Sequence, residues 1–157
     1  MTEIDFKKEY EKIKTKYKEL PDFDVINFEF EISSIEKDGF ILRRIIERIT
    51  EELEYLIGLI DDILQPDTNS FAALYECDCF GSEEKKEILD LFKRLMVYNR
   101  EAIELIIEMD DKKTVDYICR IIKEWKELRK QSAKYIKKLK QSWQETKEYK
   151  EILQYLG

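Results

Sequence analysis

Apolar residues recur at alternating steps of three and four along most of this 157-residue chain, which is the spacing of one face of an α-helix. The first such stripe lies in residues 1–20 and ends just before a proline. Proline has no amide hydrogen and biases the preceding residue away from helical geometry. The pattern therefore predicts an N-terminal helix over residues 1–20. Its apolar face would consist of Phe6, Tyr10, Ile13, Tyr17 and Leu20.

The spacing of apolar residues changes from a helical to a strand-like period after Pro21. Four large apolar residues alternate with polar ones, which would place them on one side of an extended chain. They are Ile26, Phe28, Phe30 and Ile32. No second segment with this period is available to pair with them. We therefore expect residues 21–33 to be an extended connector, with the extended segment near residues 24–32.

A long helical stripe follows the connector. Ser33 and Glu36 have the spacing of a capping box, in which the hydroxyl bonds forward to a free amide and the carboxylate bonds back. The stripe then continues without a break until Pro66. These features predict a helix over residues 34–64.

Two further helical stripes complete the chain. Residues 66–81 have the character of a loop, with one helical turn that begins at the cap-like Ser70. The apolar stripes then cover residues 88–109 and 115–143, and a polar cluster between them predicts a tight turn. Residues 144–157 either extend the last helix or form a short fifth one.

Short connections between long amphipathic helices favour antiparallel neighbours. We therefore expect an all-α fold, an up-and-down bundle of four long helices with an optional short fifth. The whole chain, residues 1–157, would form one domain, in which residues 1–20 are the N-terminal helix, 21–33 the connector and 34–157 the main bundle.

The composition narrows the classes of function. The chain has no histidine, so it offers no His-based acid–base catalysis, no Ser-His or Cys-His nucleophile and no histidine metal ligand. Its formal charge is −7, which argues against general binding to nucleic acids or anionic membranes. Richness in Lys, Glu and Ile, with few loops, is typical of thermophile proteins.

The sequence also favours a cytoplasmic location. The first ten residues lack the pattern of a signal peptide, and charges interrupt every long apolar region before it could span a bilayer. Three cysteines, an odd number, fit a reducing compartment better than a disulfide framework. We expect these cysteines to be ordinary buried or loop thiols rather than zinc ligands.

One acidic pattern suggests a metal site. It reads EExxE, a spacer and then ExxD, and it resembles the acidic motif of MazG-like all-α nucleoside triphosphate pyrophosphatases. The resemblance implies that these carboxylates gather magnesium ions, which bind the triphosphate and activate water. In a chain so rich in Glu, chance and a solvated helix face are the competing explanation. The residues are Glu83, Glu84, Glu87, Glu108 and Asp111.

A basic segment, residues 120–140, departs from the acidic character of the chain. It holds nine basic and two acidic residues, so its net charge is +7 and that of the remaining chain is −14. Five lysines lie on one face of the predicted helix, almost opposite its apolar stripe. They suggest binding of nucleic acid or of an acidic partner, against the alternative of a solubilising face. The five are Lys123, Lys126, Lys130, Lys134 and Lys137.

We expect the protein to be a non-catalytic module for protein–protein interaction or assembly. The helix over residues 1–20, the helix over 34–64 and the segment 26–32 could bury apolar surface against a second copy or another protein. No membrane partner and no cofactor are expected. Magnesium-dependent nucleotide hydrolysis, which alone would require a cofactor, and binding of an anionic partner through residues 120–140 are the alternatives.

Overall fold

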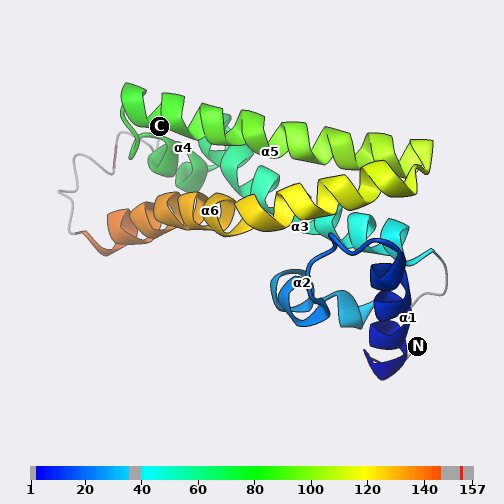
Figure 1. The fold of residues 1–157 in the computed structure, drawn as a ribbon. Coiled ribbons are helices and arrows are strands. Elements are labelled where there is room, and N and C mark those ends of the chain that lie inside the picture. The colour runs from blue at the N-terminus through cyan, green and yellow to red at the C-terminus, as the bar shows by residue number, and fades with distance from the viewer. Residues whose placement is uncertain (1–2, 36–39, 146–152, 154–157) are drawn as a thin grey trace. The chain divides into compact units, whose positions relative to one another are not determined.

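The computed structural model describes residues 3–35, 40–145 and 153, and all regular structure in these residues is helical (Figure 1). The expected all-α class is confirmed. The elements are α1 (Glu3–Lys16), α2 (Phe23–Phe30), the short 3-10 helix η1 (Ile32–Ser34), α3 (Ile41–Leu64), α4 (Phe71–Cys77), α5 (Ser82–Glu108) and α6 (Asp111–Gln144). The predicted alternatives for residues 144–157 fall almost wholly outside the described residues.

The chain divides into two compact units, and three helices contribute to both. Unit 1 consists of residues 1–54 and 97–126, and unit 2 of residues 55–96 and 127–157. Helices α3, α5 and α6 each cross a division between the units, at residues 54/55, 96/97 and 126/127. Buried apolar residues lie in both units.

The prediction of an extended connector over residues 21–33 is wrong, because residues 23–30 form α2. Phe23, Ile26 and Phe30, at steps of three and four, are buried, whereas Phe28 is 80% exposed. Backbone bonds close locally, from the amide of Ile26 to the carbonyl of Asp22 and on through the helix. The alternating pattern misled because Ile26 and Phe30 are four apart and so also share a helix face. A lone extended segment would have left its backbone groups without ladder partners.

The long helix predicted over residues 34–64 starts later than expected. Ile35 is extended, and α3 begins at Ile41 and ends at Leu64 as predicted. The Ser33 amide, which the expected capping box would pair with Glu36, donates to the side chain of Asn27 at 2.8 Å, and Glu36 lies outside the described residues. The Ser34 hydroxyl bonds back to a carbonyl at the end of α2 instead of capping a following helix. The N-terminal helix is also shorter, since α1 ends at Lys16.

Aromatic side chains form much of the core of unit 1. Phe6 and Tyr10 of α1 contact Phe23 of α2, with ring centroids 6.5 and 5.7 Å apart. Phe30, at the other end of α2, packs on Trp125 of α6 at 4.8 Å. Arg48 of α3 donates from Nε to the carbonyl of Phe30 at 3.0 Å. This bond gives a partner to one of the last carbonyls of α2, which have no acceptor role within the helix. Helix α2 therefore covers Trp125.

In unit 2, α4 packs against the end of α6 and forms hydrogen bonds with it. Ser70 caps α4 as predicted, since its hydroxyl accepts from the amide of Ala73 at 3.2 Å. The ring of Tyr75 lies 4.5 Å from that of Trp143, and its hydroxyl donates to the carbonyl of Ser142 at 2.9 Å. Trp143 in turn donates from Nε1 to Glu76 at 2.7 Å.

Candidate functional site

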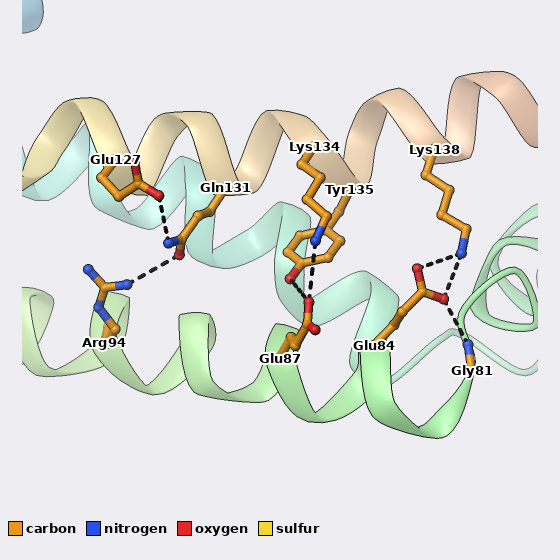
Figure 2. A network of polar contacts seen from close by, with 9 residues as sticks. All are labelled: Gly81, Glu84, Glu87, Arg94, Glu127, Gln131, Lys134, Tyr135 and Lys138. Carbon is orange, nitrogen blue, oxygen red and sulfur yellow. Dashed lines mark hydrogen bonds and ion pairs between the residues drawn. The ribbon is translucent and has the colours of Figure 1, made fainter.

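The antiparallel pairing of α5 and α6 in unit 2 creates a line of polar contacts, which we call the α5–α6 seam (Figure 2). At one end, both carboxylate oxygens of Glu84 accept from Nζ of Lys138 at 2.6 Å, and one of them also accepts from the amide of Gly81 at 3.2 Å. One helical turn further along α5, Glu87 accepts from Lys134 at 3.3 Å and from the hydroxyl of Tyr135 at 3.4 Å.

A further contact group continues the seam. Arg94 of α5 donates to Gln131 of α6 at 3.2 Å, and Gln131 donates to Glu127 at 2.9 Å (Figure 2). The seam therefore joins groups of opposite charge or complementary polarity over its length. The two site predictions from the sequence meet here at one pair, Glu87 of the acidic motif with Lys134 of the basic face, and Glu84 pairs with Lys138 of the same basic segment.

The electrostatics of the seam favour fixed charges. The hydrogen bonds from Lys138 and from the amide of Gly81 lower the pKa of the Glu84 carboxyl. The hydrogen bond to Glu87 raises the pKa of Lys134, and burial raises the pKa of Tyr135. Each group is thus held in its usual charge state at neutral pH. These contacts align two helices, and none of them tunes a group toward proton transfer near neutral pH.

The structure does not bring the five residues of the acidic motif together. Glu83, Glu84 and Glu87 lie in the first turns of α5, and Glu108 is its last residue. Glu84 therefore belongs to unit 2 and Glu108 to unit 1. Glu83 pairs with Lys86 at 2.7 Å, and Glu108 pairs with Lys113 at 2.8 Å.

The remaining motif residue, Asp111, begins α6. Over the described ranges, no group of three or more Cys, Asp or Glu side chains could hold a metal ion. Magnesium-dependent hydrolysis stays a prediction from the sequence.

The five lysines predicted to bind an anion are all exposed on α6. Lys134 pairs with Glu87, as above. Lys130 and Lys137 of unit 2, and Lys123 and Lys126 of unit 1, have no ion pair to a described residue. Lys130, Lys134, Lys137 and Lys138 line an open groove in unit 2, together with Asp78, Glu84 and Glu145. We call it the α6 groove.

The three cysteines are free thiols in partly buried positions. Cys79 donates from Sγ to the carbonyl of Tyr75 at 3.3 Å, and Cys119 donates to the carbonyl of Glu19 at 3.1 Å. Burial raises the pKa of the Cys119 thiol, which keeps it protonated and a poor nucleophile at neutral pH.

An apolar hollow in unit 1 was missed by the sequence reasoning. It lies where the first turn of α3 meets the ends of α5 and α6 that adjoin their connecting turn, and its volume is about 140 Å³. Its lining is mostly apolar, with Arg43 and Asp111 as the charged members. Phe40 (83% exposed) and Met109 (68% exposed) lie just outside the observed ends of α3 and α5, whereas the sequence placed both inside predicted helices, so no spacing signal pointed to the hollow. The apolar lining is Phe40, Leu42, Ile46, Leu105, Ile106 and Met109.

Helix α2 adds an apolar projection to the surface of unit 1. Its buried face covers Trp125, and its outer face exposes Phe28 and, to 51%, Val25. Several large apolar side chains with this much exposure on one unit are a feature of contact surfaces.

Comparisons with known proteins add no family to these observations: no family model matches the chain, and neither curated proteins nor solved structures give a match. Among the helices that the structure describes, none combines the length and the apolarity needed to cross a bilayer.

Proposed function

We propose that this protein is a non-catalytic, cytoplasmic assembly module, built as an up-and-down bundle of four long helices, that self-associates through the apolar surface of unit 1. The antiparallel pairing of α5 with α6 supports the bundle architecture. The observation that carries the function is that unit 1 presents both an exposed aromatic ring, Phe28, and an apolar hollow.

The ring and the hollow match in size and chemistry. An apolar cavity of about 150 Å³ holds a benzene ring, and the hollow measures about 140 Å³. Phe28 is 80% exposed, so its ring is free to enter the hollow of a second copy. Phe40 and Met109 would close around it and lose their own exposure to water.

A dimer with two-fold symmetry would make this contact twice. Two buried rings make a small interface, so the proposed association is weak, with an expected dissociation constant on the order of tens to hundreds of micromolar. An assembly of this kind responds to local concentration.

Sedimentation velocity over a range of protein concentrations tests the proposal. We expect the wild-type chain to pass from monomer to dimer, and Phe28→Ala to remain monomeric. Ile106→Trp, which fills the hollow from within, should have the same effect without touching α2. The matched control is Val97→Ala, which shortens a side chain of unit 1 that is 65% exposed but outside both features.

Two results would contradict the proposal. One is a wild-type chain that stays monomeric at high micromolar concentration. The other is a dimer that survives both Phe28→Ala and Ile106→Trp, since the contact would then lie elsewhere.

A further inference from the structure

Acidic and basic residues are strongly segregated along the chain. The 36 residues from Ile49 to Glu84 contain ten acidic residues and no lysine or arginine, whereas residues 120–140 carry a net charge of +7. The acidic stretch includes all of α3 that belongs to unit 2, and the basic stretch includes most of α6 in the same unit. One unit therefore bears two helical surfaces of opposite charge.

The outer face of α3 in unit 2 is acidic and lacks a described partner. Tyr55, Gly58, Asp61 and Asp62 recur at three- and four-residue steps, and all four are exposed. Neither aspartate forms an ion pair with any residue that the structure describes. Tyr55, 65% exposed, adds apolar area to this face.

The α6 groove offers a complementary basic surface. Eight of its lining residues come from α6, mostly at three- and four-residue steps between Lys130 and Ser142, so they lie along about 18 Å of one side of the helix. Lys134 and Lys138 are engaged in the α5–α6 seam. Lys130 and Lys137, which flank them, have no described ion-pair partner and remain available.

Small residues on both surfaces permit close approach of two helices. A Cβ added at Gly58 would have no atom within 4 Å, so the α3 backbone is open to the outside there. On α6, Ala133 is exposed between Lys130 and Lys137 and lines the groove. Helices with small residues at the contact pack at the short end of the usual 8–10 Å axial separation.

We propose that the α6 groove of one copy binds the acidic face of α3 of a second copy, with Lys130 and Lys137 opposite Asp61 and Asp62. The groove also contains Asp78, Glu84 and Glu145, which would repel a uniformly charged phosphate backbone. A helix face that presents two aspartates beside a tyrosine and a glycine meets this mixed lining better. The contact is independent of Phe28, and it joins two different surfaces, so it can link copies head to tail.

The experiment is an exchange of charges in the Phe28→Ala background, which removes the other proposed contact. One variant carries Lys130→Glu and Lys137→Glu, and the second carries Asp61→Lys and Asp62→Lys. At low salt we expect each variant alone to associate at least about tenfold more weakly than its Phe28→Ala parent. An equimolar mixture of the two should regain association, because each α6 then meets an oppositely charged α3.

Two controls separate this contact from general charge and from disturbed folding. Lys123→Glu with Lys126→Glu makes the same change in net charge on the same helix outside the groove, and should leave association unchanged. Gly58→Gln adds bulk without charge to an exposed helical position, so it should weaken association while the monomer stays folded by circular dichroism.

Salt provides an independent readout. Raising the salt to about 1 M shortens the screening length to ~3 Å, so this association should be lost while the Phe28 contact persists. Loss of the Phe28 contact alone would leave the low-salt association intact, which distinguishes the two proposals.

Three outcomes overturn the inference. The first is a mixture of the charge-exchanged variants that does not associate. The second is an equal effect from the Lys123→Glu and Lys126→Glu control. The third is binding of a single-stranded DNA oligonucleotide that Lys130→Glu and Lys137→Glu abolish while association of the chain is unchanged, because the groove would then serve nucleic acid.

Discussion

Glu31 occupies a backbone conformation that its side chain disfavours. Its φ and ψ are 49° and 41°, in the left-handed region, where it ends α2. An L-residue there costs roughly 1–2 kcal/mol that glycine does not incur, although glycine gains entropy in the unfolded chain. We expect Glu31→Gly to raise the free energy of unfolding by about 0.5–1 kcal/mol in urea denaturation. Glu31→Ala keeps the strain and should give no such gain, and equal values for the two would contradict this reading.

Two buried tyrosines make stability sensitive to alkaline pH. Tyr10 and Tyr117 are fully buried, and their hydroxyls donate to the carbonyls of Pro21 at 2.7 Å and Tyr98 at 3.0 Å. Burial raises the pKa of both above the ordinary value near 10. The two tyrosines therefore contribute fully to the free energy of unfolding below pH 10. This contribution is lost as the pH rises above 10, because the unfolded chain then releases protons that the folded chain retains.

We expect the free energy of unfolding to fall by up to ~1.4 kcal/mol per pH unit for each tyrosine above pH 10. Tyr10→Phe and Tyr117→Phe should each cost ~1 kcal/mol at pH 7 through the lost hydrogen bond, yet flatten the alkaline slope. Tyr55→Phe, at a position 65% exposed, is the control and should leave the slope unchanged. Urea denaturation at pH 7 and pH 11 measures both effects, and an unchanged slope in the double variant would refute the assignment.

At the scale of elements, the C-terminal end of α2 is bonded by one side chain of α3, Arg48. Arg48 bonds the Phe30 carbonyl and also pairs with Glu51 and Glu52 on its own helix. A charged donor to a partly buried carbonyl contributes ~1–2 kcal/mol. Arg48→Met keeps the aliphatic stem but removes the donor, so we expect that loss of stability together with partial release of α2 from Trp125.

Trp125 itself reports on this release. It is 2% exposed and its Nε1 has no partner among the described residues, so packing alone holds it in a dry site. In a Trp143→Phe background it is the sole tryptophan, and its emission should shift to the red in Arg48→Met. Arg43→Met removes a guanidinium that pairs with Glu47 on the same helix and should leave the emission unchanged. A red shift in both variants would contradict a specific role for Arg48.

The helices that the sequence predicts well are those with long, uninterrupted stripes. The end of α3, the capped start of α4 at Ser70 and the length of α6 follow from periodicity and local capping. Helix α2 could not be predicted securely, because eight residues with apolar groups at steps of two and four satisfy both periods. Tertiary burial of Phe23, Ile26 and Phe30 decides between them.

At the scale of the whole molecule, the sequence predictions treated the acidic motif and the basic segment separately, although the structure pairs Glu84 with Lys138. Glu84 precedes Met109 by 25 residues and Lys138 follows Asp110 by 28, so an antiparallel pair of helices brings them together. The polar residues after α5 predict a tight turn. A tight turn between two antiparallel helices sets which residues of α5 lie beside which residues of α6. The apolar hollow, in contrast, depends on side chains of three helices, and no spacing along one helix reveals it.

The tight turn between α5 and α6 has a consequence for the order of folding. Asp110 accepts the amide of Lys113 at 3.0 Å and starts α6 directly after Met109. Side-chain contacts between the two helices then close chain segments of growing length, from five residues for Glu108–Lys113 to 54 for Glu84–Lys138. Early contacts therefore cost the least loop-closure entropy, and pairing should spread outward from the turn.

Stopped-flow kinetics can test this order. Asp110→Ala, which removes the cap, should mainly slow folding, whereas Glu84→Gln should mainly speed unfolding. The reverse distribution would place the folding nucleus at the far end of the helix pair. A chain that folds from a local turn exposes its long apolar stripes only briefly. This limits the time in which partly folded chains could aggregate.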